Sequence, residues 1–199
     1  MKIIGVTGGV GAGKSAILSY LEEKYEAKIV LADQVANFLK EPGQLCYQPI
    51  IDLLGSSILQ EDGTINRKEM GRIIFSNADL LRQVNEIIHP AVKEYIIELI
   101  EKNRSIVTKV FVIEAALLLE DHYDAICDEV WYIYTSEEVR RQRLKASRGY
   151  SEEYITDIMK KQLGDEEFRS RCQVVIDNSG ELEFTKEQID KRMQKNEIM

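Results

Sequence analysis

The sequence predicts an α/β protein built on a parallel sheet of five strands. Five short runs are apolar and rich in β-branched or aromatic residues, and segments with helical periodicity lie between them. At 199 residues, the chain is long enough for one such domain with embellishments. The expected strands are residues 3–7, 28–32, 107–113, 130–134 and 174–176.

The first expected helix follows Gly13, directly after the first strand and a glycine-rich run. One face of this helix is expected to be buried, because four apolar or aromatic residues recur at helical spacing. These residues are Ile17, Leu18, Leu21 and Tyr25.

The interval between the second and third strands is about 75 residues, far longer than an ordinary crossover. Apolar residues repeat with the helical period over 80–88 and again over 92–100. We therefore expect a helical insertion over about 42–100. Because a proline disfavours helical backbone in the residue before it, the pair His89-Pro90 could separate the two helical segments.

The charge of the chain limits its partners. With 26 Lys and Arg against 34 Asp and Glu, the formal net charge is −8. This charge repels phosphate backbones at long range, so we expect neither nucleic acid nor a membrane surface as a partner. No apolar stretch has the features of a signal peptide or a membrane span. An anionic ligand must therefore meet a local positive site.

The cysteines and histidines give no sign of a disulfide framework or a zinc site. The three cysteines are far apart with no C-x-x-C pair, and the two histidines lack zinc-ligand spacing. A reduced, cytoplasmic compartment fits this pattern best.

A glycine-rich run stands between the first strand and the first helix. Residues 8–15 fit the pattern G-x-x-x-x-G-K-S/T, in which backbone N–H groups surround a phosphate. Lys14 can reach the β- and γ-phosphates of a nucleotide, and the Ser15 hydroxyl can bind Mg²⁺. The alternative is a glycine-rich turn with a solvated lysine. The expected nucleotide-binding residues are Gly8, Gly9, Val10, Gly11, Ala12, Gly13, Lys14, Ser15 and Ala16.

Other features narrow the class of nucleotide-binding protein. No Asn-Lys-x-Asp segment is present, which disfavours a GTPase switch. Asp33 follows the second strand, so we expect it at the carboxyl edge of the sheet, where ligands bind in α/β proteins. There it could accept the proton of a hydroxyl group that receives a phosphoryl group. Alternatively, Asp33 caps a helix over 34–40.

These motifs resemble those of dephospho-CoA kinases over nearly the whole chain. The first strand and loop resemble that family's opening, and Leu31-Ala32-Asp33 resembles its D-x-D segment, whose second aspartate is the proposed base. Their order and spacing are more specific than any single match. The further matches are residues 41–43, 54–55, 58–59, 62–67, 75, 88–90, 117–120, 143–144 and 176–180.

The resemblance implies a three-layer P-loop NTPase fold in a single domain, residues 1–199. It implies a core over 1–36, 101–136 and 166–199, a CoA-binding insertion over 37–100 and a helical lid over 137–165. It also implies transfer of the γ-phosphate of ATP to the ribose 3′-hydroxyl of dephospho-CoA, with Mg²⁺. We expect a monomer or a weak homo-oligomer.

The chain departs from the family pattern mainly in the lid. Ser147 and Ile158 stand at positions that usually hold arginine. An arginine over the transferring phosphoryl group strongly accelerates related reactions, so another lid arginine is expected to take this role. Arg140, Arg143 and Arg148 are the candidates, and we expect Arg143 and Arg148 to include the acting residue; the alternative is that each is a solvated charge on a helix.

The resemblance also implies contacts with the acceptor substrate. Arg67 could pair with a phosphate of the acceptor, or it could simply be solvated. His89 falls at a matching position of the family, although the pair His89-Pro90 could merely break a helix. Leu117 also falls at a matching position. Glu114 and Glu120 could assist Mg²⁺ through water or merely end local structure. Two rival functions remain at this stage, a nucleotide or nucleoside kinase and a nucleotide-binding regulatory protein without turnover.

Overall fold

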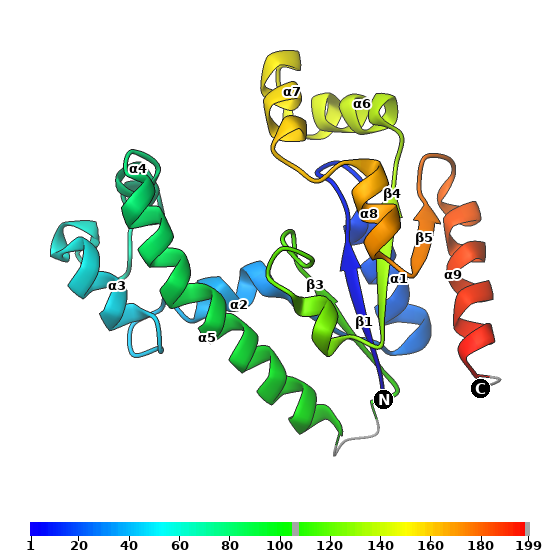
Figure 1. The fold of residues 1–199 in the computed structure, drawn as a ribbon, viewed down its shortest axis with the longest axis horizontal. Helices are drawn as coiled ribbons and strands as arrows, with labels where there is room; N and C mark the ends of the chain where they lie inside the picture. Colours follow the sequence, from blue (N-terminus) through cyan, green and yellow to red (C-terminus); the bar gives the residue numbers. More distant parts are fainter. Residues whose placement is uncertain (105–107, 198–199) are drawn as a thin grey trace. The chain divides into compact units, whose positions relative to one another are not determined.

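A computed structural model of the chain describes residues 1–104 and 108–197. Its five strands form a parallel sheet in the order β2-β3-β1-β4-β5 (Figure 1), which confirms the predicted fold class. The predicted start of the third strand at Val107 lies outside the described residues. The strands are β1 (Lys2–Thr7), β2 (Lys28–Leu31), β3 (Val110–Glu114), β4 (Glu129–Tyr134) and β5 (Val174–Asp177).

The central position of β1 determines where the glycine-rich run lies. Val6 is in register with Glu114 of β3 on one side and with Trp131 of β4 on the other. β1 is therefore buried almost throughout, and its carboxyl end delivers the loop to the middle of the sheet edge. This is the edge where ligands of parallel α/β sheets bind.

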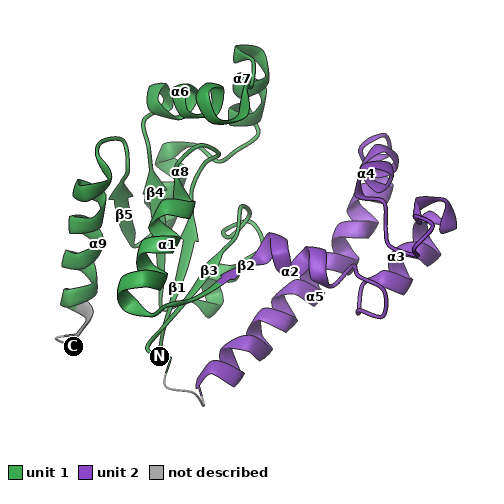
Figure 2. Ribbon diagram, turned by 180° about the vertical axis from the view of Figure 1, so that it is seen from behind, with its two compact units in different colours: residues 1–29, 108–199 green, residues 30–107 purple. Residues whose placement is uncertain are grey.

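Contacts divide the chain into two compact units, of which the first comprises residues 1–29 and 108–199. In this unit, α1 lies on one face of the sheet and α8 on the other (Figures 1 and 2). Phe168 of α8 stacks on Tyr132 of β4, with 4.6 Å between ring centroids. Asp190 of α9 accepts hydrogen bonds from Tyr20 and Tyr25 of α1. The helices are α1 (Lys14–Tyr25), α6 (Glu137–Arg148), α7 (Glu152–Lys160), α8 (Asp165–Arg171), α9 (Leu182–Glu197) and the 3-10 helix η2 (Tyr123–Ile126).

The second unit, residues 30–107, is mainly helical (Figure 2). Its long helix α5 packs against α2, α3 and α4, and Phe38 of α2 meets Tyr95 of α5 at 5.5 Å between ring centroids. The expected insertion falls within this unit. The helices are α2 (Ala32–Phe38), α3 (Tyr47–Leu54), α4 (Arg67–Phe75), α5 (Ala78–Arg104) and the 3-10 helix η1 (Ser56–Ile58).

The possible helix break at His89-Pro90 is wrong. Helix α5 runs through Pro90 as one helix. The apolar stripe continues across the proline, because Ile88, Ala91 and Val92 are all buried. Burial of this stripe offsets the hydrogen bond that the proline cannot donate.

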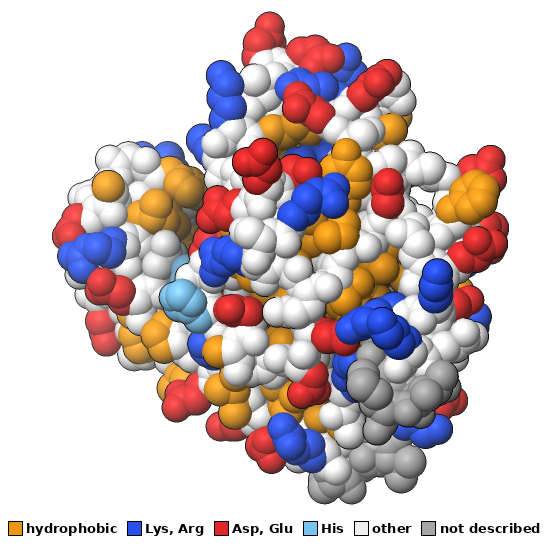
Figure 3. Space-filling model, turned by 45° about the vertical axis from the view of Figure 1, so that its right-hand side comes forward, with side chains coloured by type: hydrophobic (Ala, Val, Ile, Leu, Met, Phe, Trp, Pro, Cys, Tyr) orange, Lys and Arg blue, Asp and Glu red, His pale blue; other side chains and the backbone are white. Residues whose placement is uncertain are grey.

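The surface and the cysteines add few functional groups. Acidic and basic side chains are interspersed over the face shown in Figure 3. The three cysteines are free thiols, and burial raises the pKa of Cys127 to about 12 and that of Cys172 to about 11. Such thiols are poor nucleophiles. Among the described helices, none is long and apolar enough to cross a bilayer.

Candidate nucleotide-binding site

The glycine-rich loop forms the strand–loop–helix arrangement that its sequence predicts. β1 ends at Thr7 and α1 begins at Lys14. Gly11 and Gly13 have φ of +79° and +81°, in the left-handed region that residues with a Cβ avoid. The first amides of α1 have no acceptor within the helix, so the loop and the helix start together offer N–H groups to an anion.

Neighbouring groups approach the loop so closely that glycine is required at several positions. A Cβ at Gly8 would lie 2.6 Å from the carbonyl oxygen of Ile133, and one at Gly13 would lie 2.5 Å from Nδ2 of Asn178. A Cβ at Gly9 would overlap the guanidinium of Arg140. The loop is therefore held from several sides in one shape.

A buried polar network fixes the carbonyl of Ala12. Thr135 Oγ1 donates to this oxygen at 3.0 Å and Asn178 Nδ2 at 2.7 Å. Thr185 Oγ1 in turn donates to Asn178 Oδ1 at 2.9 Å. The sequence pointed to Asn178 only as part of a family match, and nothing in the sequence marked Thr135 or Thr185. These residues position the loop.

Lys14 lies over the loop that it follows. Its Nζ donates to the carbonyl oxygen of Gly8 at 2.8 Å and lies 3.5 Å from Oε1 of Glu114. Glu114 ends β3 beside β1, so parallel pairing brings its carboxylate to the loop. Glu114 therefore pairs with the lysine, which sequence reasoning missed.

The residues present fit a magnesium ion brought by a nucleotide. The described residues contain no cluster of three His, Cys, Asp or Glu side chains suited to a metal. Ser15 is exposed in the first turn of α1, and its hydroxyl has no partner in the described chain. Mg²⁺ prefers to keep water and phosphate oxygens, so one serine hydroxyl is a sufficient protein ligand here.

Two of the three candidate arginines of the lid lie at the loop. Arg140 of α6 donates from Nε to the Val10 carbonyl at 2.9 Å and from Nη2 to Gln162 Oε1 at 2.8 Å. The same Gln162 oxygen accepts from the Val10 amide at 3.1 Å. Burial lowers the pKa of Arg140. This bridge ties the lid segment to the phosphate loop.

Arg143 and Arg148 differ in their surroundings. Arg143 Nη2 donates to the Asn178 carbonyl at 2.9 Å, while its Nη1 is buried without a hydrogen-bond partner, 3.2 Å from the Cβ position of Gly13. Arg148 is exposed at the end of α6, 5.8 Å from the ring centroid of Tyr150. The structure places Arg143, and not Arg148, beside the loop.

Asp33 lies in the second unit, in the first turn of α2. The helix begins at Ala32 with Leu31 at the cap position, so the alternative that Asp33 caps the helix is wrong. Its carboxylate is exposed and makes no hydrogen bond within the described residues.

The other expected acceptor contacts fall in three different places. Arg67 is the first residue of α4 and lines a cavity of about 530 Å³ in the second unit. His89 lines a shallower groove of about 460 Å³ on α5. Leu117 follows β3 in the first unit and is 47% exposed.

The sheet, the loop after its central strand and the lysine and serine that follow define a P-loop nucleotide-binding protein. A family model for dephospho-CoA kinase matches residues 2–183 of the chain. A curated dephospho-CoA kinase from Carboxydothermus hydrogenoformans is 38% identical over 195 residues, which are 98% of this chain and 94% of the relative. The chain therefore belongs to the dephospho-CoA kinase family, as its motifs indicate.

Two solved structures share the fold. The structure of TT1252 from Thermus thermophilus has a TM-score of 0.81 at 24% identity, over 98% of this chain and 97% of that one. The dephospho-CoA kinase from Campylobacter jejuni has a TM-score of 0.74 at 23% identity, over 98% and 96%. At this identity the likeness supports the P-loop kinase architecture.

Proposed function

We propose that this chain transfers the γ-phosphate of ATP to the ribose 3′-hydroxyl of dephospho-CoA, giving CoA and ADP. This is the last step of CoA biosynthesis. The observation that carries the proposal is the rigid phosphate loop, with Lys14 and Ser15 at the start of α1, in a chain of the dephospho-CoA kinase family. The free cysteines agree with a cytoplasmic location.

The loop supplies the ATP-binding half of the mechanism. Its amides, from Gly8 to Ala16, bind the phosphates, and Lys14 neutralises charge on the β- and γ-phosphates. Lys14 exchanges its contact with the Gly8 carbonyl for phosphate oxygens. Ser15 would hold Mg²⁺, and the ion would supply positive charge to neutralise the phosphate oxygens.

Asp33 supplies the base in this proposal. Its exposed carboxylate has no partner within the described residues, so it is available to accept the proton of the 3′-hydroxyl. Arg67, His89 and Leu117 contact the acceptor.

Arg143 is the arginine that stabilises the transferring phosphoryl group, because its buried Nη1 lacks a partner beside Gly13. Arg140 positions the loop through Val10 and Gln162. Arg148 remains a predicted second contact.

An assay of ADP release tests the acceptor. With ATP and Mg²⁺ saturating, dephospho-CoA is expected to give the highest kcat/KM among dephospho-CoA, adenylate and unphosphorylated nucleosides. Mass spectrometry of the product is expected to show one added phosphoryl group on the acceptor. Equal or greater activity with a nucleoside monophosphate would overturn the proposal, and so would ATP binding without acceptor-dependent ADP formation.

A further inference from the structure

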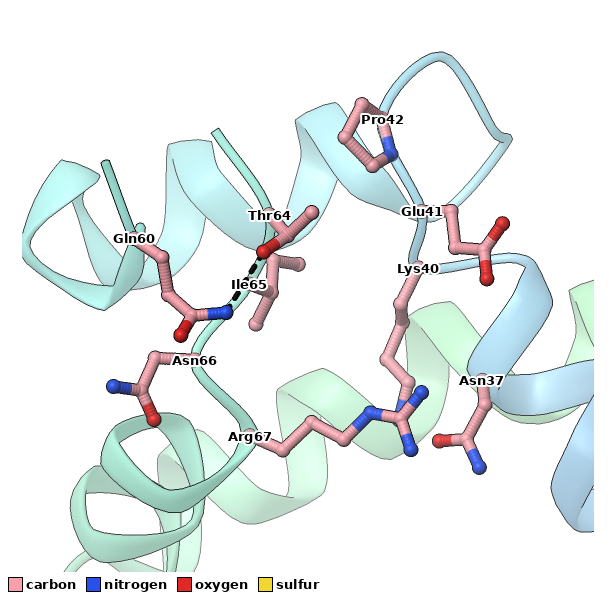
Figure 4. A pocket seen from close by; sticks show the side chains of 9 residues that line it. All are labelled: Asn37, Lys40, Glu41, Pro42, Gln60, Thr64, Ile65, Asn66 and Arg67. Atoms are coloured by element: carbon pink, nitrogen blue, oxygen red, sulfur yellow. Dashed lines mark hydrogen bonds between the residues drawn. The ribbon is translucent and has the colours of Figure 1, made fainter. Parts of the chain in front are cut away.

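Two cations, Lys40 and Arg67, line a cavity of the second unit. Lys40 follows α2, and Arg67 begins α4. Figure 4 shows the Arg67 guanidinium extending to the side of the cavity where Lys40 and Asn37 lie. Within the residues that the structure describes, neither cation forms a hydrogen bond or an ion pair through its side chain. Glu41 lines the same cavity without pairing with either.

This arrangement differs from the other arginines of the same unit. Arg72 pairs with Glu69, and Arg82 pairs with Asp79 and Glu86. Exposed cations on helices commonly form such ion pairs with carboxylates three or four residues away, and each pair changes stability only slightly. Lys40 and Arg67 lie near each other without such a pair within the described residues, and their mutual repulsion is relieved when an anion binds between them.

Arg67 lies close enough to Lys40 for its charge to act on the lysine. Burial lowers the pKa of Lys40, and the charge of Arg67 lowers it further. Cys46 and Asp33 act in the opposite direction, but the net effect is a lowered pKa, as expected for a partly buried cation beside another cation. The start of α4 adds the positive end of a helix to the same wall.

We propose that Lys40 and Arg67 bind the 5′-diphosphate of the acceptor nucleotide. The inference rests on the proposed function and adds Lys40 to it. A diphosphate carries two negative groups on adjacent phosphorus atoms, which suits one compact ammonium beside one forked guanidinium. The remaining lining includes side-chain amides that can donate to phosphate oxygens. These are Asn37, Gln60 and Asn66.

The position of Asp33 supports this assignment. Asp33 lies in the first turn of α2 and Lys40 two residues past its end, and Asp33 is near enough to raise the pKa of Lys40 electrostatically. In the acceptor, the 3′-hydroxyl and the 5′-diphosphate are attached to the same ribose. A nucleotide with its diphosphate at Lys40 therefore has its ribose hydroxyl within reach of the proposed base.

The test compares Lys40→Gln and Arg67→Gln with Lys68→Gln, which removes an exposed lysine next to Arg67 that does not line the cavity. At saturating ATP, each cavity variant is expected to raise KM for dephospho-CoA by about 10-fold or more, because each loses a charge-assisted contact. We expect KM for ATP and kcat to change by less than about 2-fold. Lys40→Arg is expected to restore most of the affinity.

Inorganic pyrophosphate provides a second readout. With ATP saturating the phosphate loop, pyrophosphate is expected to inhibit competitively against dephospho-CoA, and more weakly in both cavity variants. Thermal melts verify that each variant is folded, and having two variants keeps the test valid if one is not.

Three results bear on the inference separately from the proposed function. Unchanged KM for dephospho-CoA in both folded cavity variants would overturn it, as would an equal rise in Lys68→Gln. If the wild type shows no dephospho-CoA-dependent ADP release, the proposed function fails instead. Pyrophosphate binding measured by calorimetry, with a non-hydrolysable ATP analogue present, then still decides whether the two cations form an anion site.

Discussion

The phosphate loop and the Lys40–Arg67 cavity approach the same chemical task, binding phosphate, by different means. The loop uses backbone amides whose shape is enforced by neighbours packed where a Cβ of Gly8 or Gly13 would lie. The cavity uses two long side chains from separate elements. The first depends on shape and the second on charge, so they are expected to respond to different perturbations.

The largest effect is expected from a change of shape in the loop. Gly13→Ala adds a Cβ 2.5 Å from Nδ2 of Asn178 at a residue with φ of +81°. Because the loop must shift, kcat/KM for ATP is expected to fall by about 10³-fold, while dephospho-CoA binding measured by calorimetry changes little.

Gly43→Ala is the matched control for this substitution. Gly43 has φ of +83°, but an added Cβ there has nothing within 4 Å. It imposes similar backbone strain without the clash. If Gly43→Ala lowers kcat/KM for ATP as much as Gly13→Ala does, close packing does not explain the loop's rigidity.

The next largest effect is expected from removal of the proposed base, Asp33. Asp33→Asn keeps the size of the side chain and removes the base, so kcat is expected to fall by about 10²-fold or more, with KM for ATP nearly intact. Asp52→Asn, an exposed carboxylate on α3, serves as the control. A nearly unchanged kcat in Asp33→Asn would remove Asp33 from the mechanism.

The loop and the cavity also differ in how far the sequence alone predicts them. The loop is a contiguous motif, and its neighbours in the chain, an apolar strand and an amphipathic helix, determine its position. Asp33 was likewise placed correctly after the second strand, although the helix begins one residue before it. Local order was sufficient for both.

Features that depend on packing between distant segments were not predictable. In the sequence, Lys40 has no feature that distinguishes it from a solvated lysine. In the structure, it lines the same cavity as Arg67 of α4. Glu114 and Arg140 were candidate site residues, but the pairing of Glu114 with Lys14 and the bond from Arg140 to Val10 depend on the sheet and the lid segment. Thr135 likewise reaches the loop only through the fold. The continuity of α5 through Pro90 depends on a buried stripe that outweighs the proline.

A smaller effect is expected from the arginines of α6. Arg143→Gln is expected to lower kcat by about 10²-fold, because its buried Nη1 is the group beside the phosphate loop, and Arg140→Gln to raise KM for ATP by about 10-fold. Arg148→Gln is the exposed control, with a change below about 2-fold. A loss in Arg148→Gln comparable to that in Arg143→Gln would make Arg148 a catalytic residue.

The smallest effect concerns pH, and it separates the cavity from the loop. Burial, Arg67, Cys46 and Asp33 act on Lys40, and their net effect lowers its pKa from the usual 10.5. The free enzyme therefore loses this charge at a lower pH than a solvated lysine would. As pH rises toward that pKa, kcat/KM for dephospho-CoA is expected to fall by about 3-fold before other groups titrate. In Lys40→Arg, whose guanidinium keeps its proton, this fall is expected to disappear. A fall that persists unchanged in Lys40→Arg would assign the titration to another group and leave Lys40 without a role in acceptor binding.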